Sequence, residues 1–307
     1  MTTVTVRAPA KINLGLSVGP PRPDGYHPLA TVYQAVALYD EVKARPAPDG
    51  TLSVSVTGEG HDVVPLDATN LAVRAAALLA KRFDVDEGVA LSIHKTIPVA
   101  GGLAGGSTDA AGALVACDAL WGTQATRDDL LALASELGSD VPFCLVGGIA
   151  VGTGRGDQLS SVLARGSYEW VLAYAATGLS TPQVYAELDR VAIGPGVRAD
   201  AAPGAPEVAE PLMAALRSGD PYAVGLALHN DLEAPALRLR PGLRRTLDLG
   251  RELDALGSMV SGSGPTCLFL ASGEDHAVDL AVGLSSSGTC RLVQRASGPV
   301  HGARLVT

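Results

Sequence analysis

A glycine-rich segment in the first half of the chain has the residue types and the spacing that phosphate binding requires. It runs from Pro98 to Ala111 and reads PVAGGLAGGSTDAA, with four glycines, a serine and a threonine within residues 101–108. Glycine lets the backbone approach a ligand closely. The first amides of a following helix are unpaired and lie at the positive end of its dipole. A tightly packed helix start is the alternative, but this density of glycine favours a phosphate cradle.

Two further positions could supply the groups that act on a phosphate. Lys11 and Asn13 alternate with Ile12 and Leu14, so both polar side chains lie on one face of a predicted strand. That face lines a cleft or is an ordinary exposed face, and exposed lysines are common. Asp140 follows Gly138-Ser139 between two apolar runs and precedes Pro142, which disfavours helical geometry just before it. Asp140 is therefore a turn residue or a base at the edge of a cleft.

Together these residues match what phosphoryl transfer needs. The reaction requires donors on the phosphates, a positive group near the developing charge, and an acceptor for the proton of the attacking hydroxyl. The sequence contains neither a GxxxxGK[ST] loop nor the HRD and DFG signatures of protein kinases. Gly152, Gly154 and Gly156 resemble half of a dinucleotide fingerprint, but no helix is predicted after them. We therefore predict a kinase of another architecture.

Composition excludes several classes of partner. The 307 residues are 47% hydrophobic and 18% charged, and the net charge is -9. This acidic balance argues against nucleic acid and against an anionic membrane as partners, so an anionic substrate must meet a local positive site. The sequence leaves the oligomeric state open.

The cysteines, the first residues and the apolar runs of the chain indicate the cellular compartment. The four cysteines are widely spaced with no CxxC, which favours reduced thiols. The first residues alternate like a strand and lack the apolar core of a signal peptide, and the nearly apolar run 141–151 is too short to span a bilayer. We expect a cytoplasmic protein.

The elements that must position these residues are predicted from periodicity and capping signals. Strands are expected at 4–16, interrupted at Pro9, and at 30–38, 51–57, 89–99, 147–156, 168–174 and 290–296. Helices are expected at 71–83 after Asn70, at 109–120, at 127–137 after Thr126, from 181, at 209–217, 221–228 and 242–256, and from 274. A hairpin is expected over 258–271, and a loop or linker over 193–207.

At this point the chain resembles the GHMP kinases. The segment 98–111 is similar to their PxxxGLGGGSSDAA signature. Residues 8–14 (APAKINL), 24–27 (DGYH) and 138–143 (GSDVPF) are similar to three motifs of the branch that acts on 4-diphosphocytidyl-2-C-methyl-D-erythritol. Residues 257–265 resemble the family's C-terminal glycine motif. These motifs occur in the family's order from about residue 4 to about residue 270.

The resemblance implies an α+β fold of two domains, with a nucleotide-binding domain at 1–158, a second domain at 159–307, and the active site in the cleft between them. It implies ATP-dependent phosphorylation of the 2-hydroxyl of that substrate, in the non-mevalonate pathway of isoprenoid biosynthesis. Asp140 would be the catalytic base and Lys11 would keep it ionised.

The resemblance also implies the binding residues. Asn13 would hold the substrate near the reacting hydroxyl, Tyr26 and Tyr185 would flank the cytosine ring, and His27 would bond its edge. The ATP phosphates would be held by the segment formed by Pro98, Val99, Ala100, Gly101, Gly102, Leu103, Ala104, Gly105, Gly106, Ser107 and Thr108.

The sequence departs from the family signature at two positions, and two alternative functions stay open. Ala104 replaces a glycine of the signature, which is tolerable only if its φ is negative, and Thr108 replaces a serine. Mg²⁺ is expected with ATP, but no metal carboxylate is identified; Ser107 is one possible neighbour of the ion. The alternatives are a GHMP kinase acting on homoserine or mevalonate, and a catalytically silent ligand-binding relative.

Overall fold

The computed structural model describes residues 3–192 and 205–306. Its strands are β1 (Val4–Val18), β2 (Leu29–Ala47), β3 (Leu52–Gly58), β4 (Gly88–Lys95), β5 (Ile149–Thr153), β6 (Gln158–Ser161), β7 (Tyr168–Tyr174), β8 (His229–Asn230), β9 (Gly257–Val260), β10 (Cys267–Ala271), β11 (Leu292–Gly298) and β12 (Arg304–Leu305). Its helices are the short 3₁₀ helix His61–Val63, α1 (Leu71–Phe83), α2 (Gly105–Trp121), α3 (Arg127–Leu137), α4 (Val141–Val146), α5 (Thr181–Ala192), α6 (Glu210–Ser218), α7 (Pro221–Ala227), α8 (Glu233–Leu239), α9 (Gly242–Glu252) and α10 (Glu274–Ser286).

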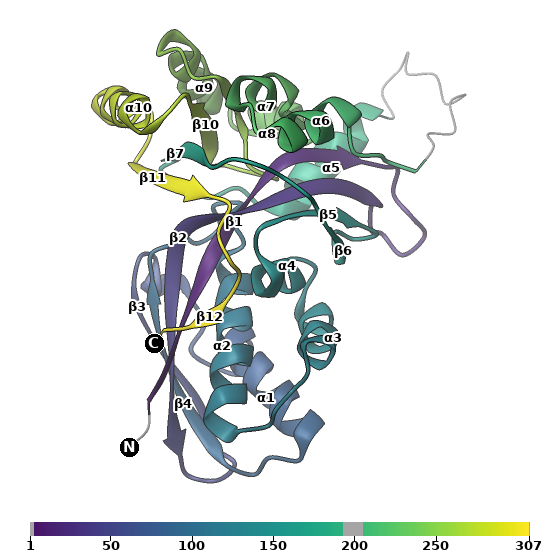
Figure 1. Ribbon diagram of the computed structural model, residues 1–307, viewed down its shortest axis with the longest axis vertical. Coiled ribbons are helices and arrows are strands. Elements are labelled where there is room, and N and C mark those ends of the chain that lie inside the picture. Colours follow the sequence, from purple (N-terminus) through teal and green to yellow (C-terminus); the bar gives the residue numbers. More distant parts are fainter. Residues whose placement is uncertain (1–2, 193–204, 307) are drawn as a thin grey trace.

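Two sheets organise these elements, and the long strands β1 and β2 extend from one toward the other (Figure 1). The first sheet has the path β12-β1-β2-β4-β3, with β5 also paired to β2, and helices α1, α2 and α3 lie beside it. The second sheet has the order β11-β7-β10-β9 and carries α9 and α10 on one face. The fold is α+β, as predicted.

The division at residue 158 stays a prediction. Strands β8 and β12, which come late in the chain, pair with β1 of the first sheet. The strand β1 runs through Pro9 without ending, but its ladder with β2 is irregular between Pro9 and Ala10, where the sequence predicts a break. The strand therefore stays long enough to reach both sheets.

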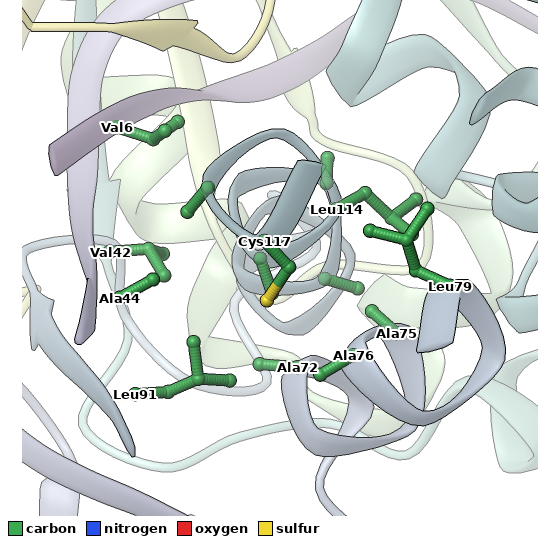
Figure 2. Packing of buried hydrophobic residues seen from close by; sticks show 14 of the residues in the cluster. Val6, Val42, Ala44, Ala72, Ala75, Ala76, Leu79, Leu91, Leu114 and Cys117 are labelled. Atoms are coloured by element: carbon green, nitrogen blue, oxygen red, sulfur yellow. The ribbon is translucent and has the colours of Figure 1, made fainter. Parts of the chain in front are cut away.

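Helix α2 packs very closely against the first sheet because its residues are small. Figure 2 shows it enclosed by side chains of β1, β2, β4 and α1, among them Val6, Val42, Leu91 and Ala76. A Cβ on Gly112 would lie 2.7 Å from the Cγ2 atom of Val42. The small residues of this helix thus let it approach the sheet, which fixes the position of the glycine-rich segment that leads into it.

The capping signals predicted two helices with their observed bounds. The Asn70 side chain accepts a hydrogen bond from the Ala72 amide at the start of α1, and Thr126 forms a reciprocal capping box with Asp129 at the start of α3. Helix α2 begins four residues earlier than predicted, inside the glycine-rich segment. Helices α4 and α8 were missed, and residues 193–204 of the predicted linker lie outside the described residues.

Among the described residues, no helix combines the length and the apolar composition needed to cross a bilayer.

Candidate active site

A cavity of about 350 Å³ brings the glycine-rich segment, Lys11 and Asp140 together. Its lining includes Ala100–Gly102 and Ala104–Ser107 from that segment, and Gly262 and Ser263 from the turn after β9. Residues from the start, middle and end of the chain therefore face one space. The sequence predicted this meeting, although the distances along the chain alone could not establish it.

Lys11 and Asp140 form an ion pair inside this cavity. Lys11 lies in β1, Asp140 lies directly before α4, and the Lys11 Nζ atom is 3.6 Å from the Asp140 Oδ2 atom. The Lys11 side chain is 8% exposed and the Asp140 side chain is 29% exposed. The carboxylate is thus open to a ligand, while the ammonium is held in a less hydrated position beside it.

A chain of hydrogen bonds orients the lysine. Lys11 Nζ donates to Asn13 Oδ1 at 2.8 Å, and Asn13 Nδ2 donates to Thr31 Oγ1 at 2.8 Å. The Thr31 hydroxyl gives its own proton to the Gly15 carbonyl, so it must accept from Asn13. The amide oxygen of Asn13 therefore faces Lys11. Asn13 lines the cavity, and its observed partners are protein groups.

The glycine-rich segment has the geometry of an anion cradle. Gly102 has a φ of 77°, and α2 begins three residues later at Gly105. The Thr108 amide donates to the Ala104 carbonyl, which is the first bond of the helix. The amides of Gly105, Gly106 and Ser107 precede that bond, so they are the free donors at the helix start.

Two alanines in this segment adopt the left-handed conformation. Ala104 has a φ of 61° and Ala100 has a φ of 55°. The expectation of a negative φ at Ala104 is therefore wrong. An alanine in this conformation costs about 1–2 kcal/mol. The surrounding structure holds the backbone in this shape.

A buried cluster of charges supports both ends of the segment. Lys95 at the end of β4 forms ion pairs with Asp40 and Asp109, and it also donates to the Gly105 carbonyl at 3.3 Å. Asp40 Oδ1 accepts hydrogen bonds from the Thr96 and Ile97 amides at 2.6 and 2.9 Å. The cluster thus ties the strand before the segment to the helix after it.

Burial and the neighbouring charges both shift the pKa values in this cluster. Burial raises the pKa of Asp109 well above its ordinary value, and the neighbouring Lys95 only partly opposes the effect. For Lys95, burial disfavours the charge, but Asp109 and Asp40 outweigh it and raise the pKa. Sequence reasoning missed this cluster because its members are far apart in the chain and belong to no local motif.

Two further cavities adjoin the first. One of about 260 Å³ shares Gly105 and Gly106 with the first. Its lining includes the apolar residues Val63, Val64, Pro65, Leu71 and Val99 and the polar residues Thr69, Asn70, Lys95 and Asp109. The other, of about 460 Å³, contains Tyr26, His27 and Tyr185 and shares Ser139, Arg155 and Thr181 with the first. The structure therefore offers a continuous path from the three predicted aromatic residues to Asp140.

Both ring nitrogens of His27 have neighbours in this path. Its Nδ1 atom donates to the Gly19 carbonyl at 2.7 Å. Nε2 lies 3.4 Å from Asp189 Oδ2, and the ring centroids of His27 and Tyr185 are 5.0 Å apart. Burial raises the pKa of Tyr185 to about 12, so its hydroxyl stays protonated.

Arg155 is a site residue that the sequence did not single out. It follows β5, and its guanidinium lies over the Tyr26 ring with 3.7 Å from Cζ to the ring centroid. Of the residues shared by the two larger cavities, which are Leu29, Ser139, Arg155, Thr181 and Tyr185, only Arg155 carries a charge.

Three of the predicted ATP-binding residues do not line any of these cavities. Pro98 is buried, Leu103 packs in the hydrophobic core, and the Thr108 hydroxyl donates to the Pro9 carbonyl at 3.0 Å. Their side chains support the segment from behind. The other predicted residues from Val99 to Ser107 face one or both of the cavities beside it.

The comparison with known proteins agrees with this geometry. Residues 70–148 match the model of the GHMP kinases N terminal domain, and residues 212–290 match that of the GHMP kinases C terminal domain. The chain is 54% identical to the 4-diphosphocytidyl-2-C-methyl-D-erythritol kinase of Mycolicibacterium smegmatis, over 99% of this chain and 92% of that protein. The chain belongs to the GHMP kinase family. As a GHMP kinase it is an ATP-dependent enzyme acting on a small molecule.

Solved structures of GHMP kinases that are named for different substrates have a similar backbone fold to this chain. A 4-(cytidine 5'-diphospho)-2C-methyl-D-erythritol kinase aligns with a TM-score of 0.75 and 34% identity, covering 95% of this chain and 98% of that one. A homoserine kinase from Cytophaga hutchinsonii aligns with a TM-score of 0.77 but only 19% identity, over 100% and 98% of the two chains. Backbone similarity therefore cannot choose the acceptor, and the choice depends on the site residues.

The described residues contain no group of three or more His, Cys, Asp or Glu side chains placed to hold a metal ion. The carboxylates behind the phosphate segment, Asp40 and Asp109, are already paired with Lys95. This donor set fits a Mg²⁺ ion that is held mainly by phosphate oxygens and water.

Proposed function

We propose that this GHMP kinase transfers the γ-phosphoryl group of ATP to the 2-hydroxyl of 4-diphosphocytidyl-2-C-methyl-D-erythritol, a step of the non-mevalonate isoprenoid pathway. The observation that carries the proposal is the Lys11–Asp140 pair, at 3.6 Å, in the same cavity as the helix start that offers free amides to phosphates. The high identity to curated kinases of this substrate supports the choice of acceptor.

Asp140 acts as the general base in this proposal. Its partly exposed carboxylate accepts the proton of the attacking hydroxyl, and the adjacent Lys11 ammonium stabilises the negative charge that develops on the oxygen. Asn13 acts mainly through Lys11, because its amide oxygen accepts the lysine's hydrogen bond. A contact of Asn13 with the substrate remains part of the proposal, since the residue lines the cavity.

The donor nucleotide occupies the other side of the site. The amides of Gly105, Gly106 and Ser107 bind its phosphates, and the cavity beside Val63 and Leu71 takes its nucleoside. Mg²⁺ would be bound by the ATP phosphates and would neutralise part of their charge, with the Ser107 hydroxyl as a neighbour. Since ATP is the co-substrate, we place the activity in the cytoplasm.

The acceptor spans the two larger cavities. Tyr26 and Tyr185 flank the cytosine ring, and His27 forms a hydrogen bond with its edge. The diphosphate then lies at the junction of the cavities, where Arg155 is the available cation. A guanidinium matches phosphate geometry with two parallel hydrogen bonds.

A single-turnover assay tests the acceptor. Purified enzyme is mixed with ATP and, in separate reactions, the cytidine substrate, homoserine or mevalonate, and the formation of ADP is followed. Only the cytidine substrate is expected to react. ADP formation with homoserine or mevalonate alone would identify another branch of the family, and binding of the cytidine substrate without turnover would identify a silent relative.

Replacing Asp140 tests the mechanism. Asp140→Asn keeps the shape of the side chain but cannot accept the proton, so kcat should fall by about 100-fold or more while substrate binding persists. Asp128→Asn, at an exposed position of α3, is the matched control and should leave both unchanged. Weaker binding with unchanged kcat in Asp140→Asn would exclude the role of base.

A further inference from the structure

Tyr33 contacts the oxygen of the Asp140 carboxylate that Lys11 does not approach. It lies in β2, its side chain is buried, and its hydroxyl donates to Asp140 Oδ1 at 3.3 Å. Lys11 approaches the other oxygen, Oδ2, and its Nζ atom lies 5.2 Å from the centroid of the Tyr33 ring. The two oxygens of one carboxylate therefore have different neighbours, one a cation and one a neutral donor.

Glycines in the β5–β6 hairpin make the space that Tyr33 occupies. A Cβ on Gly152 would lie 2.7 Å from the ring atom Cε2, and a Cβ on Gly156 would collide with the hydroxyl oxygen. On β2 the ring faces Phe143 of α4, with 4.9 Å between the centroids. Two of the glycines that resembled half of a nucleotide fingerprint thus have another purpose, since they accept a tyrosine ring against their backbone.

The hydroxyl of Tyr33 is fixed in its role as a donor. Burial, together with the nearby charge of Asp140, raises the pKa of Tyr33 well above its usual value of 10.0. The phenol therefore keeps its proton over the whole range in which a kinase is assayed, and it can only donate to the carboxylate. A donor fixed in a rigid ring limits rotation of the carboxylate about its last bond.

We propose that Tyr33 is a positioning residue for Asp140, and that its hydroxyl, seated by Gly152 and Gly156, aims the carboxylate at the hydroxyl of the acceptor. The proposal rests on the proposed role of Asp140 as the base. It assigns no contact with the substrate to Tyr33. A ring that only filled space beside Phe143 would work equally well as phenylalanine, and this difference makes the proposal testable.

The test removes only the hydroxyl. In Tyr33→Phe the ring and its packing persist, and kcat should fall by about tenfold, the order of one hydrogen bond to a charged group, while the KM values for ATP and the acceptor stay unchanged. Tyr39→Phe is the matched control, because Tyr39 is half-buried in the same strand and lines none of the described cavities. It should keep the wild-type kcat.

A double-mutant cycle separates positioning from a general structural effect. In the Asp140→Asn background, Tyr33→Phe should lower the residual single-turnover rate no further, because the group it aims is already inactive. In Gly156→Ala the added Cβ would move the Tyr33 hydroxyl away from Asp140 without removing it. This variant should therefore lower kcat as Tyr33→Phe does.

Either of two results would overturn the proposal: a wild-type kcat in folded Tyr33→Phe, or the same proportional loss in both backgrounds. Wild-type activity of Asp140→Asn alone would instead refute the proposed role of Asp140 as the base, so the two failures are distinguishable.

Discussion

At Gly102 the glycine-rich segment packs closely against the turn of residues 261–264. Gly102 has a φ of 77°, and a Cβ there would lie 2.5 Å from the Ser261 carbonyl oxygen and 3.1 Å from that of Gly264. The Ser261 hydroxyl also donates to the Gly102 carbonyl at 3.3 Å. We therefore predict that Gly102→Ala forces the segment and the 261–264 turn apart.

The cost of this substitution has two parts that a control can separate. Alanine at a left-handed φ costs about 1–2 kcal/mol. Gly122 has a φ of 65° and nothing within 4 Å of an added Cβ, so Gly122→Ala carries the conformational cost alone. The overlap with backbone oxygens in Gly102→Ala adds about 1–3 kcal/mol. We expect losses of about 2–5 kcal/mol for Gly102→Ala and about 1–2 kcal/mol for Gly122→Ala.

The free energy of unfolding in urea measures both losses, and steady-state kinetics measures the effect on ATP. Because Gly102 lines the cavity, its displacement should raise the KM for ATP by at least tenfold, whereas Gly122→Ala should leave that KM unchanged. Equal stability of the two variants, together with an unchanged KM for ATP in Gly102→Ala, would refute the contact between the segment and the turn.

Three further predictions concern the acceptor cavity. Tyr26→Ala should raise the KM for the cytidine substrate and leave the KM for ATP unchanged; an equal rise in both would mean that the two nucleotide positions are exchanged. Arg155→Gln should weaken inhibition by cytidine diphosphate about tenfold or more but leave inhibition by cytidine unchanged, since only the former carries phosphates; equal weakening would assign Arg155 to the packing of Tyr26. The pKa of Tyr185 is raised to about 12 in the folded state. Its contribution to the free energy of unfolding is therefore complete below pH 10 and is lost as the pH rises toward 12. Raising the pH from 8 to 11 should therefore lower the free energy of unfolding more in wild type than in Tyr185→Phe, by about 1 kcal/mol, and identical pH curves would contradict the shift.

Sequence reasoning succeeded where a few neighbouring residues determine the structure. Asn70 and Thr126 each supply a cap to the amides directly after them, so helices α1 and α3 could be predicted with their bounds. The hairpin of β9 and β10 was also confirmed, because its glycine turn and its apolar strands are adjacent in sequence.

It failed where the rest of the fold overrides a local preference. Pro142 was taken as a sign against helix, yet proline lacks only an amide proton that the first turn does not use, and α4 begins at Val141 with Pro142 in that turn. Ala104 was expected to avoid a positive φ, but its neighbours on both sides are fixed by the Lys95 cluster and by packing of α2. Neither constraint is visible in a short stretch of sequence.

The candidate site shows the same limit. The spacing of Lys11 and Asn13 by itself favoured an exposed strand face, and only the resemblance to the ordered motifs of the family predicted that they face a cleft. Tyr33 and Arg155 carried no signal, because Tyr33 is one of several apolar residues in β2 and Arg155 follows an ordinary glycine-rich strand. Their importance depends on what lies opposite them, which is a property of the tertiary structure.

The placement of Lys95 explains how an acidic chain of net charge -9 can bind two polyphosphates. Asp40 and Asp109 lie behind the glycine-rich segment, and Asp40 accepts hydrogen bonds from the Thr96 and Ile97 amides that directly precede it. Two unpaired carboxylates at this position would repel the phosphates through a poorly screened interior. The Lys95 ammonium forms ion pairs with both carboxylates and offsets part of their negative charge. The segment then presents phosphates with helix amides and Lys11, while the acidic groups behind it oppose the phosphates less than two unpaired carboxylates would.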